Sequence, residues 1–157
     1  MIIRHWGNAS MKLLYAVTLV ALTALAAEKK VKFEELPPAV QAGVKEQTKN
    51  ATLVGLSTEK QKGKTVYEAE TRIGGRSRDL LLDQTGSVIE TEEEVDMESI
   101  PAPARSAIQK RAAGGTISKV EKVTAGAAIR YEAAIRTKSG KTVEYAVNAD
   151  GMSHKEN

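Results

Sequence analysis

The sequence contains no cysteine among its 157 residues. This absence excludes a disulfide framework, thiolate chemistry and lipid attachment at a cleavage-site cysteine. A chain that folds outside the cytoplasm without disulfides must be held together by the packing of its core. The remaining composition, 41% hydrophobic and 27% charged, is ordinary for a globular domain.

Histidine is almost as scarce, and this limits the chemistry. The two histidines, His5 and His154, lie near opposite ends of the chain, so neither supports a catalytic triad or a metal site. Gly-Lys-Thr occurs at 63–65 and 140–142 but lacks the glycine five positions earlier that a phosphate-binding loop needs. We therefore predict turns there, and we expect no cofactor and no metal ion.

No catalytic motif is present. An enzyme would have to rely on carboxylates alone for acid–base chemistry. Glu68, Glu70 and Glu132 are the only such candidates clustered on predicted strands. We therefore expect a protein that is not an enzyme.

Residues 1–26 have the pattern of a signal peptide. Arg4 and Lys12 precede an uncharged run over 13–27, and Ala24-Leu25-Ala26 provides small residues for cleavage. Met11 is an alternative start to Met1. An uncleaved anchor is the other interpretation, but the apolar run is shorter than the roughly 20 residues of a bilayer span. The pattern predicts a periplasmic or secreted protein with no stable membrane span after cleavage.

Charge is distributed unevenly between the two halves of the remaining chain. Residues 28–98 carry 11 basic and 15 acidic residues, whereas residues 99–157 carry 10 basic and 5 acidic residues. The two halves either attract each other or form a binding surface with two poles. The small overall charge and the scarcity of aromatics argue against a nucleic-acid partner.

One pattern occurs twice, sixty-four positions apart. Tyr67–Arg72 (YEAETR) returns as Tyr131–Arg136 (YEAAIR), and Val31–Pro37 aligns with Val95–Pro101. Each Leu-Pro or Ile-Pro start precedes apolar residues spaced four apart, which predicts a helix with one buried face. Alternating segments follow in both copies and predict strands, the first of them irregular enough to carry a bulge.

These patterns predict an α+β fold made of two tandem repeats, each a helix followed by an antiparallel meander. Repeat 1 would span 27–94 and repeat 2 would span 95–157. Both helices would pack on one face of the sheet and leave the other face open. Because a unit of about sixty residues is marginally stable alone, we expect the two to share a core or a continuous sheet.

Charged residues on the outward face of the predicted strands are the candidates for partner binding. Opposite charges on neighbouring strands also stabilise a sheet, so a purely structural role is the alternative. The acidic run over 90–98 is interpreted as a solvated connector into the second helix rather than a cation site. The candidate residues are Glu68, Glu70, Arg72, Leu81, Arg130, Glu132, Arg136 and Glu144.

The chain resembles a known family in these motifs. A Leu-Pro helix start, an irregular strand, Tyr-Glu-Ala, a glycine turn and a strand ending in Asp-x-x-Gly are similar to the PepSY-like domain. Two copies in tandem resemble the periplasmic proteins grouped with the β-lactamase-inhibitor-like PepSY proteins. The similar stretch runs from Val31 to His154.

The resemblance implies an exported, non-catalytic binding module, similar to peptidase or hydrolase inhibitors, that holds a protein or peptide of the cell envelope on its open sheet face. A structural or stress-sensing envelope protein without inhibitory activity is the alternative. The family supplies no catalytic residues to transfer, and the sequence leaves the oligomeric state open.

Overall fold

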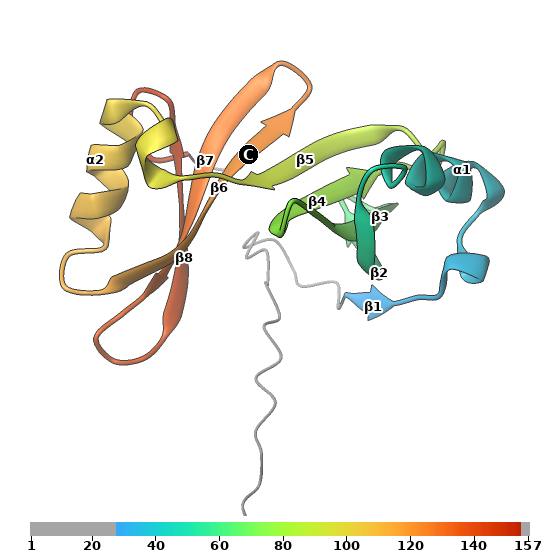
Figure 1. The fold of residues 1–157 in the computed structure, drawn as a ribbon, viewed down its shortest axis with the longest axis horizontal. Helices are drawn as coiled ribbons and strands as arrows, with labels where there is room; N and C mark the ends of the chain where they lie inside the picture. Colours follow the sequence, from blue (N-terminus) through green and yellow to red (C-terminus); the bar gives the residue numbers. More distant parts are fainter. Residues whose placement is uncertain (1–27, 155–157) are drawn as a thin grey trace, which may run out of the picture.

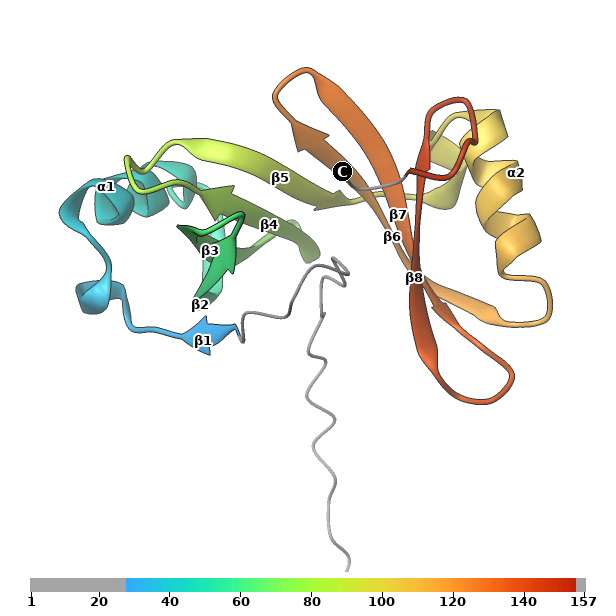
Figure 2. The ribbon, with the colours of Figure 1, turned by 180° about the vertical axis from the view of Figure 1, so that it is seen from behind.

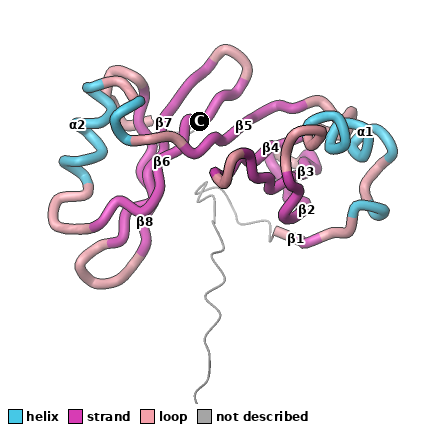
Figure 3. The backbone as a smooth tube through the Cα atoms, viewed as in Figure 1, coloured by secondary structure: helices cyan, strands magenta, loops and turns pink. Residues whose placement is uncertain are grey.

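Eight antiparallel strands form one continuous sheet in which every strand pairs with the next strand of the sequence. The computed structural model describes residues 28–154, and strands make up most of this part (Figure 1 and Figure 3). The strands are β1 (Lys29–Lys30), β2 (Thr52–Gln61), β3 (Lys64–Ile73), β4 (Arg76–Leu82), β5 (Val88–Glu94), β6 (Thr116–Ala125), β7 (Ala128–Arg136) and β8 (Thr142–Asn148).

Two α-helices of ten residues each, α1 (Pro38–Gln47) and α2 (Ala102–Arg111), lie toward opposite ends of the sheet (Figure 1 and Figure 2). Each follows a short 3-10 turn, at Phe33–Glu35 and Met97–Ser99. Proline is tolerated in the first helical turn because the backbone N–H groups there lack helical partners. α1 ends where the Thr48 hydroxyl donates to the Val44 carbonyl at 2.8 Å.

Both helices lie on the same side of the sheet, as the strand register shows. Leu80 packs in the core beneath α1 and pairs with Thr91, which pairs in turn with Thr124. Val120 points to the same side as Thr124, because side chains two apart share a face, and it packs in the core beneath α2.

The predicted arrangement of two tandem helix-plus-meander repeats is wrong. Residues 28–154 form mostly one eight-stranded meander with only two short α-helices. The sequence pattern suggests a boundary after residue 94 because a helix follows there. Instead, β5 pairs with β6 from Thr91↔Thr124 to Glu94↔Glu121, which satisfies backbone groups that an edge strand would leave unpaired.

Most of the hydrophobic core forms two clusters on the helix-covered side, while Val66 and Val123 are buried on the opposite side. The first cluster is Leu36, Val40, Val44, Leu56, Tyr67, Ala69, Leu80 and Leu82. The second cluster is Ile100, Ala104, Ile108, Ala112, Val120, Ala133, Ile135 and Val147. Burial of these apolar side chains stabilises the fold by about 25 cal/mol for each Å² removed from water.

The irregular alternation at the start of β2 and β6 corresponds to two bulges, as the sequence predicts. The pairing with β3 shifts between Leu53 and Gly55, and the pairing with β7 shifts between Ile117 and Lys119. A bulge increases the local twist of its strand. Beyond each bulge the strand keeps its apolar residues, such as Leu56 and Val120, toward the helices.

The turn after β4 packs directly on α1. Gly86 has φ +80°, and a Cβ at this position would lie 2.2 Å from the Ala39 carbonyl oxygen. Only glycine combines this left-handed backbone with so close an approach. The turn after β8 shows a similar contact, since a Cβ on Gly151 would lie 2.7 Å from the Pro103 carbonyl oxygen.

Gly86→Ala should therefore destabilise the protein more than Gly63→Ala. Both glycines have φ +80°, but a Cβ on Gly63 meets nothing within 4 Å. The two variants share a conformational cost of about 1–2 kcal/mol, and only Gly86→Ala adds a clash with α1. Urea unfolding should show Gly86→Ala to be less stable by about 1–3 kcal/mol. Equal stabilities would contradict the packing described for this turn.

Candidate functional site

The side of the sheet opposite the helices carries a concentration of carboxylates. Glu70, Asp79 and Glu92 occupy one cross-strand row, because Glu70 pairs with Asp79 and Asp79 pairs with Glu92. Alternation along the strands places the remaining acidic residues on this side too. We call it the acidic face; its strand carboxylates are Glu59, Glu68, Glu70, Asp79, Glu90, Glu92, Glu94, Glu121, Glu132 and Glu144.

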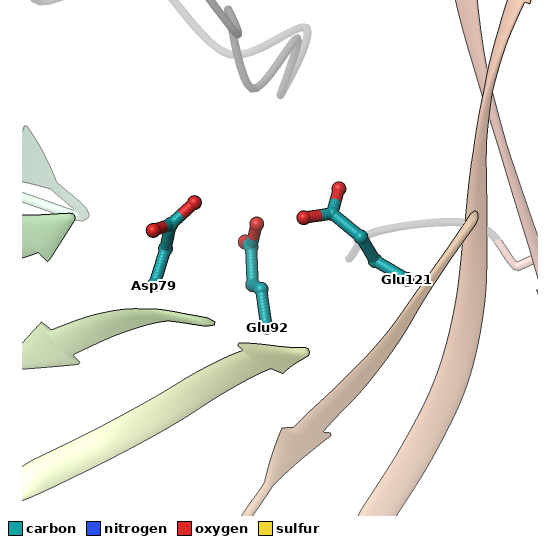
Figure 4. Close-up of side chains that lie close together, drawn as sticks. All are labelled: Asp79, Glu92 and Glu121. Carbon is teal, nitrogen blue, oxygen red and sulfur yellow. The ribbon is translucent and has the colours of Figure 1, made fainter. Parts of the chain in front are cut away.

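Three of these carboxylates converge at the centre of the face. Oxygens of Asp79 on β4, Glu92 on β5 and Glu121 on β6 all lie within 4.8 Å of one another. Figure 4 shows the three side chains rising on the same side of their strands. Asp79 and Glu92 are half-buried, and Glu121 is only 7% exposed. We call this group the carboxylate cluster.

Burial shifts the protonation of the carboxylate cluster. Loss of hydration, followed by the negative charges of Glu132, Glu121, Glu90 and Asp79, raises the pKa of Glu92 from 4.5 to about 9. Burial also raises the pKa of Asp79 and of Glu121. At neutral pH the cluster therefore retains a proton.

Glu68 is a second carboxyl group with altered titration. Burial raises its pKa to about 7, although a hydrogen bond that the Ser57 hydroxyl donates to Oε2 at 2.9 Å opposes the shift. Glu68 therefore changes charge near neutral pH, where an ordinary glutamate is fully ionised.

Lys119 supplies the cluster with a cation. Its Nζ lies 2.5 Å from Glu121 Oε1, but the contact lacks hydrogen-bonding geometry, so this buried oxygen has an ion pair and no hydrogen bond. Burial lowers the pKa of Lys119, while Glu121, Asp79 and Glu92 together raise it more. We assign no metal to the cluster, because an ammonium group already lies against it and flat strands do not wrap oxygens around an ion.

Arg130 connects β7 to β5 across β6. Its Nη1 and Nη2 donate to Glu90 at 3.0 and 3.2 Å, and its Nε donates to Glu132 at 2.6 Å. The Arg130 side chain is only 10% exposed. A bidentate contact of this kind is specific for the planar guanidinium.

The sequence-predicted residues divide between the centre and the margins of the face. Glu68, Glu70, Leu81, Arg130 and Glu132 lie centrally, with Leu81 paired between Glu68 and Glu90. The other three lie toward the margins: Arg72 and Arg136 are exposed at strand ends, and Glu144 is half-buried on β8 opposite Ala134.

The expected pairing between the charges of β3 and those of β7 is absent. β4, β5 and β6 separate these two strands, so Arg130 reaches Glu90 rather than Glu68 or Glu70. Two similar strands in one sheet need not be neighbours, because a meander pairs each strand with the next in the sequence.

The interpretation of residues 90–94 as a solvated connector is also wrong. They belong to β5, a central strand of the sheet. The two-residue spacing of Glu90, Glu92 and Glu94, together with the β-branched Val88, Ile89 and Thr91, is the signal that indicates a strand. Sequence reasoning also missed Asp79, Lys119 and Glu121, which meet only through the register of β4, β5 and β6.

Comparisons with solved structures show that the fold is similar to those of several Bacteroides proteins. A B. eggerthii protein assigned to the periplasm matches with a TM-score of 0.61 and 14% identity, over 76% of this chain and 86% of its own. A DUF2874 family protein from B. uniformis matches with a TM-score of 0.59 and 15% identity over the same shares.

A BLIP-like protein from B. fragilis matches with a TM-score of 0.53 and 20% identity, over 78% of this chain and 86% of its own. The fold of this chain is therefore BLIP-like. No family model and no curated protein matches the sequence. Within residues 28–154, no helix has the length and apolar character needed to span a membrane.

Stability should fall as the pH rises through the neutral range. The pKa values of Glu92 and Glu68, about 9 and about 7, exceed the ordinary value of 4.5. Below about pH 4.5 both groups are protonated in the folded and the unfolded chain, and above it the folded chain holds protons that the unfolded chain has lost. We expect the free energy of unfolding to decrease by several kcal/mol between pH 5 and pH 9.

Glu92→Gln should flatten this pH dependence and stabilise the protein at pH 9. Glu93→Gln is the matched control, since Glu93 is on the same strand and faces the helix side, 3.8 Å from Arg78. Urea titrations at several pH values measure both effects. A pH slope that is unchanged in Glu92→Gln would show that Glu92 ionises normally.

Arg130→Gln should cost about 3 kcal/mol of stability, because it leaves the carboxylates of Glu90 and Glu132 buried without their partner. Arg136→Gln removes the same charge from an exposed position of the same strand and should change stability by no more than about 0.5 kcal/mol. Thermal and urea unfolding compare the two variants. Similar losses would mean that the Arg130 contacts contribute little.

Proposed function

We propose that this protein is an exported, non-catalytic binding module that holds a basic protein or peptide of the cell envelope on its acidic face. The carboxylate cluster is the observation that carries the proposal. Removing carboxylates from water is unfavourable, and one lysine, Lys119, is close to the three of the cluster. A fold that nevertheless keeps three of them within 4.8 Å of one another retains an arrangement that a positive charge from a partner would stabilise.

The charges of the face favour a basic partner. On strands β2–β8, ten carboxylates share this face with five cations, and the two central cations, Lys119 and Arg130, are already engaged with carboxylates of the face. The negative charge left over is complementary to lysine or arginine side chains. Such complementarity accelerates association and selects the partner more than it adds affinity.

The shape of the face is suited to a polypeptide. Both helices pack on the other side of the sheet, and within residues 28–154 no helix covers the acidic face. Leu81 lies among the carboxylates and offers an apolar contact. The BLIP-like fold and the periplasmic neighbours support a protein-binding role outside the cytoplasm.

Export and inhibition complete the proposal. The leader over 1–26 lies outside the described residues, and its cleavage would release the module into the periplasm. The resemblance to β-lactamase-inhibitor-like proteins further implies that the partner would be a hydrolase or peptidase that the module inhibits.

A crosslinking pull-down from periplasmic extract tests the proposal. The purified protein should capture a protein with a basic contact surface, and Glu70→Lys should weaken this binding about tenfold, which is about 1.4 kcal/mol. Glu46→Lys makes the same charge change on the exposed surface of α1 and should bind normally. Melting curves confirm that both variants fold.

Three outcomes would contradict the proposal. Equal binding by Glu70→Lys and the unchanged protein would show that the acidic face does not bind the partner. Capture of cell-wall or lipid components instead of a protein would favour the structural envelope role. Capture of an enzyme whose activity is unaffected would support the binding role but contradict inhibition.

A further inference from the structure

The sheet has a narrow connection at its centre. β5 and β6 share four residue pairs, from Thr91↔Thr124 to Glu94↔Glu121, whereas β2–β3 and β6–β7 each share nine. One further backbone bond, from Val95 N to the Val120 carbonyl oxygen at 2.9 Å, extends the connection. We call these pairs the seam.

The hydrophobic core does not bridge the seam. All members of the first cluster come from residues 36–82, and all members of the second cluster come from residues 100–147. The two ends of the sheet are thus packed separately, each beneath its own helix. Relative movement of the ends would leave both clusters intact, so the seam must resist such movement by itself.

Charged side chains on the acidic face both attract and repel one another across this seam. Arg130 on β7 attracts Glu90 on β5. In the other direction, Glu92 on β5 lies against Glu121 on β6, with oxygens within 4.8 Å. Two ionised carboxylates at this distance repel each other, whereas a proton on either one removes the repulsion.

We propose that the seam is a proton-dependent joint, in which a proton on the carboxylate cluster keeps β5 and β6 paired and loss of that proton loosens them. The two ends of the sheet then move relative to each other while each keeps its own core. This inference goes beyond the proposed function and can be tested without any partner.

The surroundings of Glu92 favour retention of the proton. The groups that face it from the neighbouring strands are mostly acidic, and the high pKa of Glu92 agrees with that environment. Lys119 and Arg130 are the basic groups of this set, and each contacts other carboxylates. The set comprises Glu68 and Glu70 on β3, Asp79 on β4, Glu90 and Glu94 on β5, Lys119 and Glu121 on β6, and Arg130 and Glu132 on β7.

The short seam is the element that such repulsion would open first. Local opening occurs where few backbone bonds and little apolar burial hold two segments together. The seam has fewer backbone bonds than the β2–β3 and β6–β7 ladders, and neither core cluster spans it, although Val123 of the seam is fully buried. Ionisation of the cluster would therefore act on the seam before it acts on either core.

Hydrogen exchange of backbone amides at pH 6 and pH 9.5, corrected for the intrinsic rate, tests the joint. Protection of Val95 and of β5 amides bonded to β6 should fall at least tenfold at the higher pH, relative to amides of the β2–β3 ladder. Glu92→Gln should abolish this difference, and Asp79→Asn should reduce it if Glu92→Gln folds poorly. Glu93→Gln should retain it.

A distance measurement provides the second test, helped by the absence of native cysteine. Spin labels at Ala42→Cys and Ser106→Cys, exposed positions on α1 and α2, should show a broader distance distribution at pH 9.5 than at pH 6. Labels at Ala42→Cys and Lys64→Cys, both at the α1 end, should show no change.

Several results would overturn the joint. Equal loss of protection in the seam and in the β2–β3 ladder would mean that ionisation weakens the whole fold. Unchanged protection of Val95 and β5, a loss that persists in Glu92→Gln, or an unchanged distance between the helix labels would each exclude a proton-dependent seam.

Discussion

The pairing of β5 with β6 is the contact on which the continuous sheet depends. Without it, Val88–Glu94 and Thr116–Ala125 would both be edge strands with unpaired backbone groups. Neither hydrophobic cluster extends across this pairing. The backbone ladder and the side chains above it therefore carry the whole connection, and Arg130 strengthens it by bonding to Glu90 on the far strand.

The same region contains the least favourable chemistry of the fold. The half-buried carboxylates of Asp79 and Glu92 and the buried carboxylate of Glu121 face one another, although each ionised group would be better hydrated at a strand margin. Apolar packing at both ends of the sheet offsets this cost, since Leu80 and Val147 are fully buried. Local conflicts of this kind, in an otherwise consistent structure, occur mostly at functional positions.

How much of this structure the sequence predicts depends on whether the interaction concerned is local or joins residues that are distant in sequence. The two-residue period places Tyr67 in the core and marks Glu68, Glu70, Arg130 and Glu132 as outward-facing, because alternation is a local property. Continuity of the sheet and convergence of the carboxylate cluster are not local. They depend on the register of β4, β5 and β6, in which Asp79 and Glu121 are 42 positions apart in sequence and α2 lies between them. Acidic composition concealed the end of β5, beyond Thr91, for a related reason: glutamate is depleted in strands, yet it tolerates a strand when its carboxylate lies on the face without helices.

The residues that determine the fold are also different from those that would determine the function. The solved neighbours share 14–20% identity with this chain, a level at which packing is retained while surface chemistry is free to differ. The helix-covered clusters explain why the meander forms, and they would do so with any polar residues on the opposite face. Asp79, Glu92 and Glu121 are not needed for that meander and weaken it at neutral pH. The unfavourable burial of these three carboxylates is therefore better evidence for a role of the acidic face than the fold itself.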